Sequence, residues 1–250
     1  MRIRLLWLLG PVAVSATSAH TEVLEPDSSY IESIAFEEVL PEEPGAWALR
    51  LSAALERPAG EEDTFVVPKL QAFFGITERL GAEIEAPLVM RFGPDDDVGL
   101  GDVGAGAKFV IVKQSGRVPA VVGLLEVHAP SGDADRMLGA GSTEIEGAIG
   151  IVLALPSVVL QGTFGYATTV SGSEARLVDN VSVAVRLTRR FYGLAEVLVE
   201  TELPSGELRV ATGPGVKYAV TSEMFVAACI VLGVADETSH RAIVQVQHGF

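Results

Sequence analysis

Apolar and polar residues alternate with a period of two along most of the chain beyond residue 45. In residues 47–55, for example, Trp, Leu, Leu, Ala and Leu occupy the odd positions and Ala, Arg, Ser and Ala the even ones. This period is that of a β-strand whose two faces meet different surroundings. The pattern predicts an all-β chain of about twelve strands, each near the ~9–11 residues of a tilted membrane-spanning strand. The further runs lie at residues 66–74, 80–88, 103–111, 118–129, 145–153, 158–166, 181–187, 193–201, 209–218, 224–234 and 242–250.

The last of these runs ends on an aromatic residue, Phe250. An alternating strand that stops on a terminal aromatic is how bacterial outer-membrane β-barrels finish, and Phe250 is our candidate signal for the barrel-assembly machinery. An even number of antiparallel strands is typical of bacterial single-chain barrels. We therefore predict an antiparallel transmembrane β-barrel over residues 46–250, with a soluble β-sandwich as the alternative.

The hydropathy of the chain favours the barrel. Its mean value, +0.36, is high for a soluble protein. Beyond residue 19, however, no apolar run approaches the ~20 residues that a membrane-spanning helix needs. A barrel with an apolar outer surface has both properties, because its strands are apolar on one face only.

The N-terminal residues 1–19 have the features of a secretory signal peptide. Arg2 and Arg4 form a short basic region, residues 5–16 are nearly all apolar, and Thr-Ser-Ala at 17–19 offers a cleavage site. The apolar run is too short for a transmembrane anchor. We predict that residues 1–19 are removed during export.

A second distinct segment, residues 20–45, holds eight acidic residues and no Lys or Arg, and three prolines interrupt it. Such a composition favours an extended acidic arm on the periplasmic side of the membrane. The alternative is a short element, centred on residues 30–36, that plugs or touches the barrel mouth. We therefore predict that residues 20–45 are a periplasmic arm or plug.

The predicted connections between strands differ according to their order along the chain. Odd-numbered connections are acidic or glycine-rich and lie at residues 57–63, 93–100, 130–141, 171–179, 203–207 and 235–240. Even-numbered connections are mostly shorter and lie at residues 75–79, 113–117, 155–157, 188–192 and 221–223. Outer-membrane barrels have long outer loops and short periplasmic turns, so this sorting supports the barrel.

Composition excludes several classes of function. The formal net charge is −15, which repels nucleic acid, and no basic patch occurs. The single cysteine, Cys229, has apolar neighbours and is predicted to be a small buried side chain. Residues 99–104 have the glycine spacing of a dinucleotide-binding loop, but that motif needs a helix where this chain alternates as a strand. We therefore predict no cofactor and place these glycines on the lumen face, where they keep the interior open.

One predicted outer loop is rich in carboxylates, with Asp95, Asp96, Asp97 and Asp102 close together. Hard cations bind carboxylate oxygens, so these four residues are candidates for a metal site. Their spacing lacks the order of a calcium-binding loop. A solvated outer loop is therefore the favoured interpretation.

His128 and Ser131 lie close together near the predicted outer rim. Some outer-membrane barrels are lipid hydrolases that use such a pair. A nucleophilic serine also needs an orienting acid and an oxyanion donor, and the sequence indicates neither. Pro130 and Gly132 favour a plain loop at this position.

Charged residues occupy the predicted inward face of the strands. A charge on the lipid face at mid-membrane would cost about 2–4 kcal/mol, so these side chains are expected to face the lumen. There they either form ion pairs that fill the barrel or leave a polar path for a small solute. The predicted lumen-lining residues are Glu83, Glu85, Glu126, Glu144, Glu146, Glu196 and Glu200, with Arg50, Lys69, Arg91, Lys108, Arg186, Arg209 and Lys217.

Three glycine-rich phrases together resemble one known family. They are Gly-Leu-Gly-Asp at 99–102 followed by Gly106 and Lys108, His-Ala-Pro-Ser-Gly-Asp at 128–133 with Leu-Gly-Ala-Gly-Ser at 138–142, and Gly-Pro-Gly-Val-Lys-Tyr at 213–218. From about residue 73 to the C-terminus, the chain resembles the outer-membrane barrel family MetA-pathway of phenol degradation. The resemblance implies a transporter barrel linked to uptake of aromatic or other small hydrophobic compounds, and it supplies no catalytic residues.

We therefore expect a monomeric outer-membrane channel that contacts membrane lipids, admits small aromatic or hydrophobic solutes through a mixed-charge lumen, and has no enzymatic activity. Two alternatives stay open. One is a non-conducting structural or adhesion barrel, and the other is a lipid hydrolase that uses His128 and Ser131.

Overall fold

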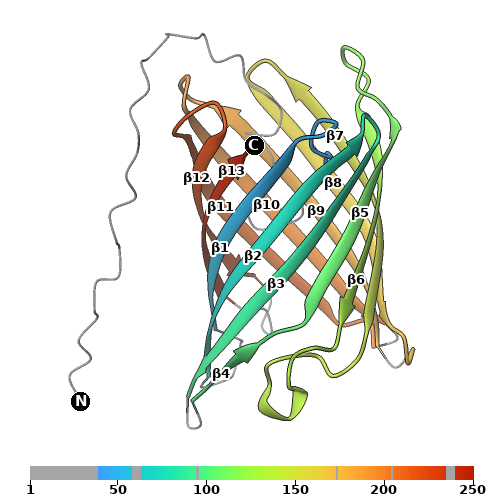
Figure 1. The fold of residues 1–250 in the computed structure, drawn as a ribbon, viewed down its shortest axis with the longest axis vertical. Coiled ribbons are helices and arrows are strands. Elements are labelled where there is room, and N and C mark those ends of the chain that lie inside the picture. Colours follow the sequence, from blue (N-terminus) through green and yellow to red (C-terminus); the bar gives the residue numbers. More distant parts are fainter. Residues whose placement is uncertain (1–38, 58–62, 94–95, 173, 204, 235–239) are drawn as a thin grey trace, which may run out of the picture.

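The computed structural model describes residues 39–57, 63–93, 96–172, 174–203, 205–234 and 240–250. The predicted signal peptide, the first part of the acidic segment and Asp95 lie outside these residues. Within them the chain forms thirteen β-strands and one short 3₁₀ helix (Figure 1). These are β1 (Trp47–Arg57), β2 (Thr64–Thr77), β3 (Leu80–Phe92), β4 (Asp97–Leu100), β5 (Val103–Val112), β6 (Ala120–Ala129), η2 (Ala134–Arg136), β7 (Glu144–Leu155), β8 (Val158–Thr169), β9 (Ala175–Arg186), β10 (Phe191–Leu203), β11 (Leu208–Ala219), β12 (Met224–Gly233) and β13 (His240–Gly249).

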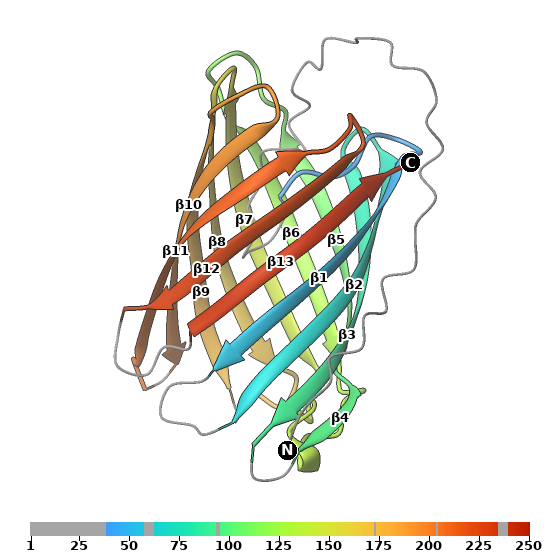
Figure 2. The same cartoon turned by 90° about the vertical axis from the view of Figure 1, so that its left-hand side faces the viewer.

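Twelve of these strands form one closed antiparallel sheet (Figures 1 and 2). β1 pairs with β2 on one side and with β13 on the other, which closes the wall. The remaining strand, β4, has four residues and pairs only with the part of β3 that extends beyond the β3–β5 ladder. The prediction of a twelve-stranded antiparallel barrel is confirmed.

Most strands are longer than the sequence pattern predicts, because the wall strands run for ten to fourteen residues, whereas β6 and β12 are slightly shorter than the predicted runs. The predicted loop at residues 171–179 is wrong in its second half, since Ala175–Asp179 belongs to β9 and pairs with β8 and β10. In this stretch Arg176 and Asp179 lie on opposite faces of the strand. Neither face therefore has the apolar character by which a strand is recognised.

The two faces of the wall differ as the alternation predicts. Outward-facing apolar side chains are well exposed, for example Leu51 at 58% and Val181 at 57%, whereas the inward-facing Lys108 is only 3% exposed. In a membrane the exposed face meets lipid, which is the arrangement of a transmembrane barrel. Two aromatics of the wall, Tyr192 and Phe225, are buried inside the barrel.

Within the described ranges, no helix has the length and apolar character needed to cross a membrane.

The two ends of the barrel are distinguished by their connections. Trp47 and Phe250 lie at the end that carries the short turns, and their backbones exchange two hydrogen bonds of 3.3 and 2.8 Å. Their rings stack with centroids 4.0 Å apart. Short turns face the periplasm in outer-membrane barrels, so we name this the periplasmic end and the opposite one the outer end.

The outward face generates a prediction about the cost of a charged residue at different depths in the membrane. Leu125 lies in the middle of β6 and is 52% exposed, whereas Leu208 begins β11 at the outer end and is 53% exposed. Leu125→Arg should lower the free energy of unfolding from lipid vesicles by about 2–4 kcal/mol, and Leu208→Arg by only about 0–1 kcal/mol. Denaturant titration of both variants checks this, and equal losses would contradict the assigned membrane position.

The terminal aromatic generates a second prediction. Phe250→Ala removes the stack on Trp47, which is worth about 0.5–1.5 kcal/mol, and also removes the proposed assembly signal. We expect a smaller folded fraction in the outer membrane, measured by the heat-dependent shift of the folded barrel on gels. Phe92→Ala removes a comparably exposed aromatic at the outer end and serves as the control. An equal loss in both variants would show that Phe250 has no special role.

Candidate functional site

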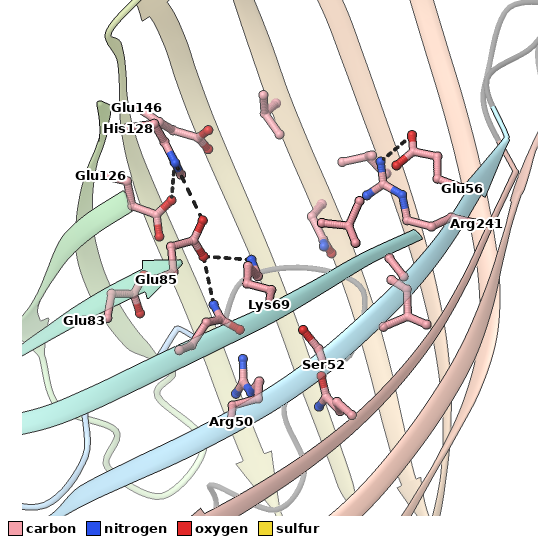
Figure 3. Close-up of a pocket in the computed structure, with 18 of the residues that line it drawn as sticks. Arg50, Ser52, Glu56, Lys69, Glu83, Glu85, Glu126, His128, Glu146 and Arg241 are labelled. Carbon is pink, nitrogen blue, oxygen red and sulfur yellow. Dashed lines mark hydrogen bonds and ion pairs between the residues drawn. The ribbon is translucent and has the colours of Figure 1, made fainter. Parts of the chain in front are cut away.

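A cavity of about 370 Å³ lies inside the barrel and is lined by side chains from nine strands (Figure 3). Most of its lining residues are polar, and carboxylates outnumber basic side chains. An acidic group lies on one side of the view, and an Arg241–Glu56 pair lies on the other. The charged and imidazole side chains of the lining are Arg50, Glu56, Lys69, Glu83, Glu85, Glu126, His128, Glu146 and Arg241.

Two glycines of β5 bring side chains from the neighbouring strands together. Gly106 pairs with Glu83 on β3 and with Glu126 on β6. A Cβ atom at Gly106 would lie only 2.9 Å from Glu83 Cγ and 3.1 Å from Glu126 Cγ. The missing side chain therefore provides the space in which these two carboxylates approach each other across β5.

Gly104, two residues before Gly106 on the same lumen-facing side of β5, has the same arrangement closer to the outer end. It pairs with Glu85 and with His128, and a Cβ atom there would lie 2.7 Å from Glu85 Cγ and 3.0 Å from His128 Nδ1. The two ring nitrogens of His128 lie 3.6 Å from Glu85 and 3.4 Å from Glu126. The predicted role of Gly104 is therefore corrected, because side chains fold over it instead of leaving that space open. Gly99 and Gly101, the other glycines of residues 99–104, lie next to Leu138 and Pro87.

The acidic group is partly neutralised by two lysines. Lys69 Nζ donates to Glu85 Oε2 at 2.8 Å, and Gln71 donates to the same oxygen at 3.1 Å. Lys108 Nζ lies 2.8 Å from Glu83 Oε2, with both side chains less than a tenth exposed. That oxygen has no partner of hydrogen-bond geometry among the described residues, so the attraction is mainly Coulombic.

The other side of the cavity presents guanidinium groups. Arg50 donates to Gln247 Oε1 at 2.7 Å and lies over the ring of Phe73, 4.6 Å from its centroid. Arg241 donates to Glu56 at 3.0 Å. Glu56 and Arg241 are the cavity's charged residues that the sequence pattern missed, because they stand at strand ends next to loops.

The remaining predicted lumen residues lie away from this cavity. Near the outer end, Arg176 forms two 2.7 Å hydrogen bonds with Glu144, Arg209 pairs with Glu202 and Glu207, and Arg91 lies 3.7 Å from Asp63. At the periplasmic end, Arg186 donates to the backbone oxygen of Pro156. Glu196 and Lys217 are each 1% exposed, and Glu200 is half-buried on β10.

Much of the interior toward the periplasmic end is apolar. Val39, which precedes β1, is fully buried and packs with inward-facing residues such as Val122 and Val152. A Cβ atom at Gly150 on β7 would lie 2.4 Å from Val39 Cγ1, and one at Gly81 on β3 would lie 2.7 Å from Pro41 Cβ. Residues 39–45, which we name the inner segment, therefore begin inside the barrel at Val39 and reach exposed positions at residues 43–45.

The pair that suggested a hydrolase is not assembled. The Ser131 hydroxyl donates to Gly101 O at 2.9 Å and accepts from Val103 N–H at 2.8 Å. His128 instead faces Glu85 and Glu126 inside the barrel. Ser131 thus joins two outer loops through backbone groups.

The aspartates of the outer loop are engaged in hydrogen bonds. Asp102 accepts from the backbone N–H groups of Gly132 and Ala140, at 2.9 and 2.7 Å, and Asp96 accepts from Gly93 N–H at 3.1 Å. A hydrogen bond from Arg136, 2.6 Å from Nε, holds the pKa of Asp97 below its usual range. Nowhere in the described chain do three or more His, Cys, Asp or Glu side chains form a group suited to a metal ion.

Two buried amides of the cavity were not predicted. Asn180 on β9 and Gln245 on β13 are each 3% exposed and line the cavity. Gln245 alternates with Val244 and Val246, so the period of two would have placed it in the lumen had uncharged polar residues been considered. Asn180 lies next to the stretch of β9 that the sequence pattern assigned to a loop.

Comparisons with known proteins agree with this architecture. Residues 45–243 match the family model described as MetA-pathway of phenol degradation. The chain is also similar to an outer membrane channel from Pseudomonas putida F1, with 12% identity, a TM-score of 0.67, and coverage of 90% of this chain and 99% of that chain. No curated protein matches its sequence.

Further solved structures have the same barrel fold. NanC porin has a TM-score of 0.57 and 11% identity, with 79% of this chain and 98% of that chain covered. The translocator domain of autotransporter NalP from Neisseria meningitidis has a TM-score of 0.54 and 12% identity, with 84% and 89% covered. At such low identities these similarities establish the fold, which is that of bacterial outer-membrane barrels.

The buried ion pair of the site generates a prediction about stability. Lys108→Met leaves the Glu83 carboxylate buried without its cation and should lower the free energy of unfolding by about 3–5 kcal/mol. Lys113→Met breaks the exposed Lys113–Glu78 pair, whose side chains are 48% and 76% exposed, and should cost about 0–1 kcal/mol. Denaturant unfolding in vesicles compares the two, and a loss below 1 kcal/mol for Lys108→Met would contradict the burial of this pair.

Proposed function

Because this chain belongs to the MetA-pathway of phenol degradation family over residues 45–243, we propose that it is a channel that passes small solutes across the outer membrane. The observation that carries the proposal is the polar cavity inside a closed barrel whose outer face is apolar. A cavity of about 370 Å³ is large enough for one small organic molecule, since ligand pockets begin near 300 Å³. The cavity thus forms one stage of the solute path.

The lining supports passage of molecules with both polar and apolar parts. Charged groups stand beside apolar side chains such as Val67, Leu198 and Ile243. Small aromatic or hydrophobic solutes with a polar group fit such a lining, because each part finds a matching surface. Six of the fourteen charged residues predicted for the lumen line this cavity.

We infer that the inner segment closes the path at the periplasmic end. Val39 occupies the apolar interior, while Gly45 N–H donates to Gly75 O at 2.7 Å. Residues 39–45 form no strand of the wall, so they can leave without breaking any β-ladder. We therefore assign the segment as a movable plug of the periplasmic end, which refines the predicted arm or plug over residues 20–45.

The protein's partners follow from its surfaces. The apolar outer face fits membrane lipids, and Phe250 at the end of the last strand fits recognition by the assembly machinery. One chain supplies all twelve wall strands, so a second copy is not needed to close the barrel, and a monomer is expected. Hydrolase chemistry is disfavoured, because the Ser131 hydroxyl is bonded to backbone groups and does not face His128.

The plug generates a prediction about conductance. Val39→Asp places a charge in the buried apolar cluster, which costs several kcal/mol unless the segment leaves. We expect larger or more frequent openings in planar lipid bilayers than for the parent chain, and the same for a chain that begins at Gly45. Val234→Asp, at a position 65% exposed near the outer end, is the matched control.

The outcomes separate the plug from the channel. Equal conductance of the parent, Val39→Asp and truncated chains would contradict the plug and keep the channel. Silence in all three, with each barrel shown to be folded, would contradict the channel and favour a structural or adhesion role.

A further inference from the structure

The cavity carries more carboxylates than cations. Its lining holds five glutamates and three Lys or Arg residues. Two of the glutamates pair with basic residues of the lining, Glu56 with Arg241 at 3.0 Å and Glu85 with Lys69 at 2.8 Å. Glu146 makes neither an ion pair nor a hydrogen bond within the described part of the chain. Glu83 pairs with Lys108, which does not line the cavity, and Glu126 lies 3.4 Å from His128 Nε2. Glu146 is therefore the lining glutamate that no basic side chain of the described residues contacts.

The position of the Glu146 carboxylate lowers the stability of the empty barrel. Glu126 on β6 and Glu146 on β7 are direct cross-strand partners, and both face the cavity. Like charges directly opposite each other on adjacent strands destabilise a sheet. A positively charged group between the two carboxylates would turn this repulsion into attraction.

Two further groups of the cavity lack partners. Neither amide atom of Asn180 has a hydrogen-bond partner among the described residues, and the same holds for Gln245 Nε2. Both side chains are 3% exposed and line the cavity. A buried amide that makes no hydrogen bond lowers stability, so a bound polar group that satisfies it is favoured.

Apolar side chains stand beside these amides, together with the polar Thr163 and Ser52. Val178 lies two residues before Asn180 on the same inward face of β9, and Ile243 stands in the same relation to Gln245 on β13. Leu198, the cross-strand partner of Asn180 on β10, also lines the cavity. An apolar body can therefore pack beside the amides while a charged end reaches the glutamates.

We propose that the cavity is a binding site for small organic amines, in which Glu126 and Glu146 hold the ammonium group and Asn180 and Gln245 accept or donate hydrogen bonds beside an apolar body. The proposal rests on the channel function above and names the class of solute that this stage of the path selects. A neutral solute would leave the Glu126–Glu146 repulsion in place, and an anion would increase it. A metal ion is disfavoured, because no three His, Cys, Asp or Glu side chains of the described residues form a group suited to one.

The test is equilibrium binding of three molecules of similar shape to the full chain folded in detergent micelles. Phenethylamine, phenethyl alcohol and phenylacetate share an aromatic body and differ in the charge of the polar end. Titration calorimetry should give an affinity for the amine at least about tenfold above that for the alcohol, because a charge-assisted hydrogen bond is stronger than a neutral one by about that factor. The acid should bind more weakly than the alcohol.

Variants locate the site. Glu146→Gln should lower the amine affinity by about tenfold or more, whereas Glu223→Gln, in an exposed turn at the periplasmic end, should leave it unchanged. Asn180→Leu should weaken the binding of tyramine, an amine whose phenol hydroxyl gives the amide a partner, without lowering the stability of the barrel, because it removes an amide that has no partner in the empty cavity. A purely structural role for Asn180 would reverse this, with stability lost and binding unchanged.

The outcomes distinguish this inference from the channel proposal. Equal affinity for amine and alcohol, or an unchanged affinity in Glu146→Gln, would overturn the amine site even if the barrel conducts. Selective amine binding by a folded barrel that never conducts would keep the site and contradict the channel.

Discussion

Every backbone N–H and C=O group inside a membrane has to be satisfied by the chain itself, and the pairing of β1 with β13 is the contact that makes this possible here. Ten residue pairs, from Ala48–Gly249 to Arg57–His240, join the first strand to the last and leave no open edge. Once the sheet is closed, the alternation of each strand decides which side chains meet lipid and which meet the interior. The apolar outer face and the charged interior are two consequences of this one closure.

The interior that results is too wide to be filled by small side chains. Eight strands give a barrel that its own side chains just fill, so twelve leave additional space. This chain fills part of that space with long charged residues that fold over Gly104 and Gly106, and part with Val39 of the inner segment. The space that is left is the cavity. Its lining contains two glutamates that repel each other and two amides that lack hydrogen-bond partners among the described residues, and these groups favour a polar ligand.

The fold could be predicted from the sequence because a period of two is imposed by the membrane on every strand. The prediction failed at Ala175–Asp179, where polar residues on both faces hide the period, although pairing with β8 and β10 makes this stretch a strand. The inward position of Glu83, Glu85 and Lys108 could also be read from alternation. The partners of these side chains could not be predicted, since the contacts across β5 depend on the register of three strands.

The uncharged residues of the site are harder to predict from the sequence than the charged ones. Asn180 is one polar residue among many, and only the register of β8, β9 and β10 puts it into the cavity without a partner. Val39 belongs to the segment of residues 20–45, whose composition indicates an extended arm. Its burial depends on the space in front of Gly150, a residue more than a hundred positions away in the chain.

The central claim is that the charged cavity belongs to a water-filled path through the outer membrane. It is tested most directly by the reactivity of a single cysteine at Ser52, a cavity-lining residue of β1, in a background where Cys229, the chain's one native cysteine, is replaced by alanine. The account predicts that a membrane-impermeant thiol reagent modifies Ser52→Cys in intact cells. A cysteine that stays unmodified both in intact cells and in opened envelopes would show that the cavity is sealed, which would contradict the account.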